Sequence, residues 1–443
     1  MASSLVKDST ITFLTRILLF ILGMGTSIIV ARVLGPSAKG SYNILRLVIT
    51  VVSLLVLFGL GSANVYYGSR DPDSLAVLAG NSIVAAFGLG FVGIIIVELA
   101  TLLPIFQNYL LTNDIPVQWV RWLILLLPII QLNAYLKEIT RASGDMVRYN
   151  LIAVWRAFVY LSGVVILVLV FDRGIGGAVV AWILAVLLTS ILIVWWALRI
   201  TKGKISVRWQ TLRRNFLFGI RLYPGNIAQF LNYRLDVFLV GLFLTPRDVG
   251  IYVTATMLAE KLWEIPRAIS TVLLHRIASE RDSEIAAATT ARISRVIAFL
   301  IGGMSLLVVV ASYPIIYLMY GQAYLPAASA LIALVPGIWF LSVGKLLATH
   351  LSATGRPEIG TLGAIVSLTA TFVLDFLLIP RIGIIGASIA SSVSYMLSTT
   401  IFVIIFLRSA SLPISDVILM TRGDVILLYK AFGNMRMRHL RKT

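Results

Sequence analysis

The sequence predicts an all-α polytopic membrane protein, with about twelve transmembrane helices in two pseudo-symmetric six-helix lobes around a central cavity. Three observations support this prediction. Of the 443 residues, 59% are hydrophobic and only 13% are charged, which is far too apolar for an ordinary soluble protein. The apolar residues form segments of about 20, the length that crosses a bilayer. Several short patterns also recur at an offset close to 210 residues.

Apolar segments follow one another along the chain, separated by short polar breaks. The predicted spans are 12–33, 44–66, 77–99, 119–138, 151–172, 175–198, 217–244, 249–273, 294–319, 325–351, 359–380 and 383–407. Pro128 and Pro336 lie inside two of these spans, and each is expected to kink its helix because proline removes a backbone hydrogen bond.

The distribution of basic residues predicts the orientation of the chain. With the N-terminus inside, and with the ends of the spans counted with the adjoining loops, the inner side holds 24 of the 37 Lys and Arg residues and the outer side holds seven, while the remaining six lie deeper within spans. Because cytoplasmic loops carry the excess of Lys and Arg, both termini are expected in the cytoplasm. The expected location of the protein is the inner, or cytoplasmic, membrane of the cell. The net charge of +18 is then explained by orientation, and a nucleic-acid partner is not expected.

The repeated patterns occur in the same order in both halves. Leu34, Pro36, Gly40 and Tyr42 recur as Leu244, Pro246, Gly250 and Tyr252, and later matches include Gly144 with Gly355 and Gly174 with Gly383. Because six spans separate equivalent positions, both halves are expected to have the same membrane orientation. We predict an N-terminal lobe at 1–199, a cytoplasmic basic linker at 200–216, a C-terminal lobe at 217–407 and a basic amphipathic cytoplasmic tail at 408–443.

Several classes of site are disfavoured by the composition and motifs. The absence of Cys removes thiolate nucleophiles and thiolate-bound metals, and there is no G-x-x-x-x-G-K-[ST] phosphate loop. The three His residues have no ligand spacing, so no metal site is expected. We therefore predict no catalytic residues and no cofactor, and the protein is expected to work as a monomer among membrane lipids.

Charged residues inside two spans mark the candidate site, because charge at membrane depth is costly and usually faces a protein interior or a watery cavity. On the 249–273 span, the helical period places six polar or flexible residues on one stripe: Thr256, Met257, Glu260, Lys261, Glu264 and Arg267. The alternative is a self-neutralising ion network that only holds this helix in place. Glu260 and Glu264 are therefore candidates for ion coupling or for structural pairing.

A second polar stripe lies on the 217–244 span, where Asn226, Gln229, Asn232 and Asp236 share one face and Arg221 extends it inward. Arg234 falls on another face, and its alternatives are a role in the cavity, pairing with another helix or a position near the outer interface. Asp236 is the third candidate for ion coupling or structural pairing.

Several basic residues lie in the same half of their predicted spans. Arg156, Arg221, Arg267 and Lys345 lie in the inner halves of their spans, and this pattern predicts a cationic basin for an anionic substrate arriving from the cytoplasm. The predicted substrate-binding residues are Arg221, Lys261, Arg267, Arg156, Lys345, Asn226 and Gln229. For the long basic side chains the alternative is snorkelling toward the inner interface.

The chain resembles the polysaccharide transporter family, the lipid-linked oligosaccharide or O-antigen flippases of the multidrug/oligosaccharidyl-lipid/polysaccharide exporter superfamily. The resemblance covers essentially the whole chain. The residues that carry it are Ala31, Arg32, Leu34, Gly35, Pro36, Gly40, Tyr42, Asn232, Arg234, Asp236, Gly250, Tyr252, Ala255, Gly355, Pro357, Pro380, Gly383, Gly386 and Ala387.

This resemblance implies two lobes around a cavity that moves a polyprenyl-pyrophosphate-linked glycan to the outer leaflet by alternating access, for lipopolysaccharide or other surface polysaccharide. A proton or sodium ion is the expected coupling ion. The alternatives are a peptidoglycan-precursor flippase or a drug/cation antiporter of the same fold, and, from another class, a membrane glycan polymerase or ligase.

Overall fold

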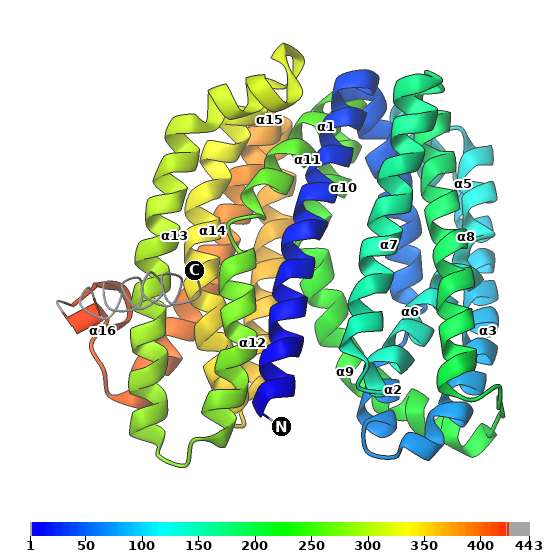
Figure 1. Ribbon diagram of the computed structural model, residues 1–443. Helices are drawn as coiled ribbons and strands as arrows, with labels where there is room; N and C mark the ends of the chain where they lie inside the picture. Colours follow the sequence, from blue (N-terminus) through cyan, green and yellow to red (C-terminus); the bar gives the residue numbers. More distant parts are fainter. Residues whose placement is uncertain (1, 422, 425–443) are drawn as a thin grey trace, which may run out of the picture. The chain divides into compact units, whose positions relative to one another are not determined.

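The computed structural model describes the backbone of residues 2–421 and 423–424, and these residues are almost entirely helical, with no strand among them (Figure 1). Apolar helices with internally satisfied backbone hydrogen bonds are what a lipid environment demands. Large apolar side chains such as Phe91, Ile191 and Leu306 are more than half exposed, as expected where lipid covers the surface. The chain is therefore a multi-pass membrane protein.

Two of the helices are long enough to cross the membrane twice. Helix α1 (Ala2–Leu55) folds at Gly35, where φ is 73°, and α15 (Pro357–Ala410) folds at Ile382 and Gly383, where φ of the glycine is 64°. A positive φ is accessible to glycine at little cost, so each glycine allows a turn between two spans. After a break at 56–59, α2 (Leu60–Gly68) completes the second predicted span.

The N-terminal half continues with α3 (Leu75–Thr101), α4 (Pro104–Thr112), α5 (Val117–Ile124), α6 (Leu127–Ala142), α7 (Met146–Val164) and α8 (Gly174–Ile200). Helices α5 and α6 form one span that bends by 42°. Pro128 is the second residue of α6, so the kink predicted there is confirmed.

The C-terminal half contains α9 (Trp209–Asn232), α10 (Leu235–Phe243), α11 (Pro246–Ala259), α12 (Glu264–Ser279), α13 (Ser283–Tyr320), α14 (Ala327–Ala353), α15 and the short α16 (Ser415–Ile418). Helix α14 continues through Pro336 without interruption. The 217–244 span is broken at Tyr233 and Arg234, and the 249–273 span is broken at 260–263. The single charged stripe predicted on the 249–273 span is therefore wrong, because Glu260 and Lys261 lie within the break and Glu264 and Arg267 lie on the helix after it.

The number of spans follows from these breaks. In the described part of the chain, seven helices are long and apolar enough to span, or eight when α5 and α6 count as one. Because α1 and α15 each contain two spans, and because α9 with α10 and α11 with α12 are two further broken spans, the count becomes twelve. The bundle has the roughly twelve spans that the sequence predicts.

The chain divides into two compact units. Unit 1 comprises 1–230, 240–251 and 319–323, and unit 2 comprises 231–239, 252–318 and 324–443. In unit 1, α2, α3, α6 and α8 share a core that contains Leu78, Tyr135, Ile139 and Trp196. The superposition of residues 1–199 on 217–407 remains a prediction.

Two repeated glycines make a reciprocal backbone contact inside unit 1. A Cβ atom on Gly40 would collide with the carbonyl oxygen of Pro246, and a Cβ atom on Gly250 would collide with the carbonyl oxygen of Pro36. These four residues are the two copies of one repeated pattern. Only glycine permits this close approach, which explains why glycine occupies both position 40 and position 250.

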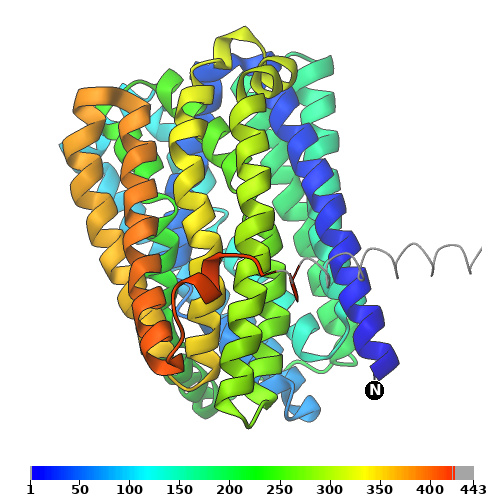
Figure 2. The same cartoon turned by 90° about the vertical axis from the view of Figure 1, so that its left-hand side faces the viewer.

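In unit 2, α13, α14 and α15 share a core into which the start of the tail packs. Val417 is fully buried, and Leu412 and Ile418 pack beside it against a cluster that includes Leu347 and Phe406. Figure 2 shows this tail segment crossing the helical bundle. The rest of the predicted amphipathic tail, 425–443, lies outside the described residues.

Candidate functional site

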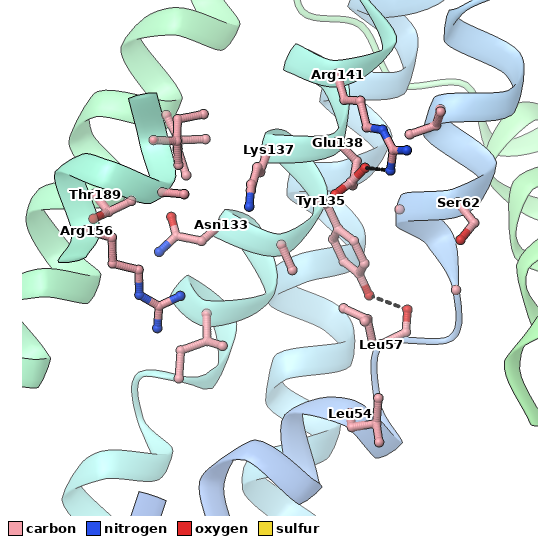
Figure 3. A pocket seen from close by; sticks show the side chains of 18 of the residues that line it. Leu54, Leu57, Ser62, Asn133, Tyr135, Lys137, Glu138, Arg141, Arg156 and Thr189 are labelled. Carbon is pink, nitrogen blue, oxygen red and sulfur yellow. Dashed lines mark hydrogen bonds and ion pairs between the residues drawn. The ribbon is translucent and has the colours of Figure 1, made fainter. Parts of the chain in front are cut away.

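A cavity of about 1090 Å³ lies within unit 1. Its walls come from α1, α2, α6, α7, α8 and α9. The volume is at the upper end of the range for sites that hold drug-sized ligands, so it can admit the head of a larger amphiphile. Figure 3 shows many of the side chains that line it.

Arg46 on α1 is the base of this cavity that lies among three aromatic rings. Its guanidinium carbon lies 5.6 Å from the ring centre of Tyr42, 5.5 Å from that of Tyr160 and 5.8 Å from that of Trp182. The hydroxyl groups of Tyr42 and Tyr160 are 2.6 Å apart and share a hydrogen bond. Aromatic faces attract a cation, so these rings hold Arg46 in place without neutralising its charge.

The α6 wall presents a second group of charges. Asn133, Lys137 and Arg141 are spaced by four residues and therefore share one face, with Glu138 beside them. The Lys137 ammonium lies 4.6 Å from the ring centre of Tyr149, and Glu138 pairs with Arg141 at 3.6 Å. In Figure 3, Lys137 lies between Arg156 on one side and the Glu138–Arg141 pair on the other.

The charge of the cavity lining is positive. Four bases, Arg46, Lys137, Arg141 and Arg156, line it together with one acid, Glu138, among the residues that the structure describes. Arg156 lies close enough to Arg46 and Lys137 for their charges to interact. Like charges gathered in a concave site create a favourable position for an anion with several charges.

Aromatic and neutral polar groups complete the walls. Tyr66 stacks on Phe218 with ring centres 4.7 Å apart. The Tyr135 hydroxyl donates a hydrogen bond to the Leu57 carbonyl at 2.9 Å, which orders the α6 wall against the break before α2. Ser62, Asn133 and Thr189 also line the cavity. The site therefore combines anion binding with flat apolar faces and hydrogen-bonding groups.

The structure distributes the predicted site residues between the two units. Arg156 and Asn226 line the unit 1 cavity, whereas Arg221 and Gln229, also in unit 1, are not among its lining residues. Lys261, Arg267, Lys345, Asp236, Glu260 and Glu264 belong to unit 2. The unit 1 cavity thus contains two of the ten predicted residues.

In unit 2, the two helix breaks lie together. Arg234, at the break between α9 and α10, donates two hydrogen bonds of 2.8 and 3.3 Å to the carboxylate of Glu260, at the break between α11 and α12. Tyr233 contacts Trp263 with ring centres 4.7 Å apart, and the Lys345 ammonium lies 4.4 Å from the Trp263 ring centre. The alternative of pairing with another helix is therefore the correct one for Arg234.

Two further charges of the predicted stripe form a loose pair. Arg267 and Glu264 pair one helical turn apart at 3.7 Å, and both side chains are exposed. Lys261 lies within the break itself. Glu264 and Arg267 therefore form one local pair, while Glu260 belongs to a different and tighter one.

Two buried carboxylates form a further polar cluster in unit 2. Asp236 accepts hydrogen bonds from the Tyr252 hydroxyl at 2.5 Å, the Val237 amide at 2.7 Å and the Ser391 hydroxyl at 3.4 Å. Asp375 is fully buried, and neither of its oxygens has a hydrogen-bond partner within the described part of the chain. The charges of Asp236 and Asp375 are close enough to interact. The described residues contain no group of three potential metal-binding side chains.

Sequence reasoning missed Arg46, Lys137, Glu138 and Arg141. Arg46 is one of the seven bases counted on the outer side, because it lies near the start of the 44–66 span, but α1 continues from Gly35 to Leu55. Arg46 is therefore about 16 Å from the Gly35 turn along the helix axis. Lys137 and Arg141 belong to the inner bases that set orientation, and only their four-residue spacing could have indicated a shared face.

Comparisons with known proteins agree on family and fold. A family model described as "Polysaccharide biosynthesis protein" matches residues 29–329. No curated protein matches the chain.

Solved structures share the fold at low sequence identity. An inward-facing multidrug resistance MATE family transporter of the MOP superfamily matches with a TM-score of 0.74 at 16% identity, over 91% of this chain and 98% of that one. The lipid II flippase MurJ in an inward closed conformation matches with a TM-score of 0.70 at 17% identity, over 97% and 93%. A MOP superfamily transporter from Pyrococcus furiosus, described as having a binding pocket of reverse polarity, matches with a TM-score of 0.61 at 18% identity, over 92% and 95%.

Proposed function

We propose that this chain, which belongs to the polysaccharide biosynthesis protein family, is a flippase that moves a polyprenyl-pyrophosphate-linked oligosaccharide from the cytoplasmic to the outer leaflet. The observation that carries the proposal is the unit 1 cavity, in which four bases face one acid. A diphosphate offers several charged acceptor oxygens, and arginine and lysine side chains are the protein groups that bind them best.

Arg46 and Arg156 are the proposed diphosphate site. Both line the cavity and interact electrostatically with each other, so a bound diphosphate relieves their repulsion as well as forming hydrogen bonds. The aromatic rings around Arg46 hold its guanidinium in position before substrate arrives. The polyprenyl chain then remains in the lipid that surrounds the exposed apolar helices.

The same charge pattern argues against export of organic cations. A cationic ligand would face four bases, and the one acid of the lining already pairs with Arg141 at 3.6 Å. A peptidoglycan precursor is the stronger alternative, because it carries the same diphosphate and because the fold is shared with a lipid II flippase. The glycan rather than the diphosphate must distinguish these two substrates.

We further propose that Asp236 and Asp375 couple transport to a proton or sodium gradient. Two buried carboxylates that interact with each other cannot both be charged without a large cost unless a proton or cation accompanies them. Asp375 has unused acceptor oxygens within the described structure, and Ser391 and Tyr252 supply further oxygens beside Asp236. Replacement of Asp375 by Asn should abolish acceleration by an imposed gradient while leaving binding of inorganic diphosphate intact.

The flipping test uses purified protein in vesicles with a polyprenyl-diphosphate oligosaccharide, and lipid II as a separate arm. We expect transport of the oligosaccharide and at least a ten-fold loss in Arg46→Gln and Arg156→Gln, equivalent to about 1.4 kcal/mol for each. Arg121→Gln is the matched control, because Arg121 pairs with Glu98 outside the cavity. Transport at the unmodified rate by both cavity variants, in protein with unchanged thermal stability, would refute the proposed site.

A further inference from the structure

We propose that Lys137, Glu138 and Arg141 form a second anion site that recognises a carboxylate on the glycan, so that the preferred substrate carries an acidic sugar such as a uronic acid. This inference rests on the proposed function and adds the class of glycan to it. Its basis is the difference between the charge of the cavity and the charge of the diphosphate.

The cavity carries more positive charge than a diphosphate can neutralise. Each phosphate of a diphosphate diester carries a single negative charge, which Arg46 and Arg156 together balance. Lys137 and Arg141 remain, with Glu138 as the one lining acid among the described residues. A net positive charge in a partly desolvated site is unfavourable unless a ligand supplies the matching anion. One carboxylate would match it.

The Glu138–Arg141 pair is loose enough to be exchanged. Its 3.6 Å separation exceeds the 2.7 to 2.9 Å of a strong charge-assisted hydrogen bond, and nearly half of the Arg141 side chain is exposed. The Arg234–Glu260 pair in unit 2 shows the contrast, because it makes two hydrogen bonds and its shorter contact is 2.8 Å. Arg141 therefore keeps hydrogen-bond donors available for a ligand, whereas Arg234 uses two of its donors on Glu260.

The α6 wall places this second site along the cavity rather than at the diphosphate. From Asn133 to Arg141 the cavity face of α6 extends over about 12 Å, because eight residues rise 1.5 Å each. Lys137 lies between Arg156 and the Glu138–Arg141 pair in Figure 3. An oligosaccharide that begins at the diphosphate can reach this group with one of its first sugars, and Ser62 and Thr189 offer hydrogen-bonding groups along the cavity.

The experiment compares two lipid-linked oligosaccharides that share lipid and diphosphate and differ only in having glucuronic acid or glucose at one position. We expect the unmodified protein to transport the acidic form about ten-fold faster at low substrate concentration. In Lys137→Gln/Arg141→Gln the acidic-to-neutral ratio should fall to about one. Glu138→Gln should raise the ratio above that of the unmodified protein, because it removes the competing carboxylate. Arg121→Gln is the control and should keep the original ratio.

The outcomes separate this inference from the proposed function. Equal transport of both oligosaccharides by the unmodified protein overturns the acidic-sugar site and leaves the flippase in place, whereas transport of neither refutes the flippase. A double variant that slows both substrates equally assigns Lys137 and Arg141 to the diphosphate and also overturns the inference. If the double variant does not fold, an unchanged or lowered ratio in Glu138→Gln is sufficient to reject it.

Discussion

At the scale of single residues, geometry around a charge matters as much as its sign. The guanidinium of Arg46 lies against three aromatic rings, and the hydrogen bond between Tyr42 and Tyr160 holds two of those rings together. A planar guanidinium stacks on such rings and offers a fork of donors, whereas a lysine ammonium is a compact, strongly hydrated point charge. We therefore expect the three aromatic rings around position 46 to favour arginine over lysine.

We predict that Arg46→Lys weakens inhibition of flipping by inorganic diphosphate about ten-fold, although the charge is kept. The measurement is the diphosphate concentration that halves transport in vesicles. Arg121→Lys, outside the cavity, is the matched control and should leave that concentration unchanged. Equal inhibition of Arg46→Lys and the unmodified protein would show that only charge matters at this position.

At the scale of elements, close backbone contacts and helix breaks organise each unit. Gly40 and Gly250 permit the reciprocal approach to Pro246 and Pro36 in unit 1. In unit 2 the breaks in the 217–244 and 249–273 spans are joined by the Arg234–Glu260 pair. Discontinuous helices expose backbone groups at membrane depth, where substrate and ion sites are typically built.

We predict that Gly40→Ala lowers the free energy of unfolding by about 1 to 3 kcal/mol or more, because the new methyl group would collide with the Pro246 carbonyl. Gly23→Ala on the same helix is the control. Nothing lies within 4 Å of its added Cβ atom, so it should be neutral or stabilising by up to about 1 kcal/mol. Thermal unfolding in detergent measures both, and equal melting temperatures for the two variants would contradict the contact.

Asp424, at the start of the tail, pairs with Arg292 and Arg295 of α13, and we call this group of residues the clasp. The Asp424 carboxylate accepts hydrogen bonds from Arg295 at 2.8 and 3.3 Å and from the Thr421 hydroxyl at 2.8 Å, and Arg292 lies 3.6 Å away. The hydrogen bonds from Arg295 lower the pKa of Asp424 from 3.8 to about 2, against the opposing effect of burial. Because the folded pKa is depressed, the clasp contributes its full stability above pH 3.8 and loses it as pH falls toward 2.

We therefore predict that a spin label on Ser415→Cys is equally immobile at pH 7 and pH 5 and becomes mobile only between about pH 4 and pH 2. The chain has no native Cys, so the label is unique. Adding Asp424→Asn should mobilise the label at every pH, because the neutral amide loses the charge-assisted bonds. A mobility transition near pH 6, or no effect of Asp424→Asn, would contradict the clasp.

At the scale of the whole molecule, the surplus of basic residues on one side predicts orientation. The non-helical segment between α8 and α9 carries Lys202 and Lys204, and both side chains are exposed. We predict that a Cys at position 204 reacts with an impermeant reagent added to inverted vesicles, whose outer surface is the cytoplasmic face, and does not react in intact cells. A Cys at Arg173, predicted to be outside, is the matched control and should react only from the outer side. Labelling of position 204 in intact cells would reverse the topology.

Much of the fold could be predicted from the chain because it depends on composition and periodicity. Lipid leaves a spanning segment with few options besides a helix, so apolar length alone indicated about twelve spans. The repeated glycines carried further information: Gly144 and Gly355 have φ of 79° and 86°, and Gly174 and Gly383 have φ of 55° and 64°. Equivalent residues in the two halves thus share a positive φ, which glycine adopts more easily than other residues.

The tertiary structure alone decided which charges meet. The charges of the 249–273 span were placed on one stripe by assuming an unbroken helix, and the break at 260–263 instead lets Glu260 pair with Arg234. The count of basic residues by side uses Arg46, Lys137 and Arg141 only to predict orientation. In the structure these three residues converge with Arg156 in one cavity, because α1, α6 and α7 pack around it. Hydropathy and spacing describe one helix at a time, whereas a binding site is formed by side chains from several helices. By itself the sequence determined a multi-pass helical membrane protein with an internal repeat, and only packing determined where its positive charge gathers.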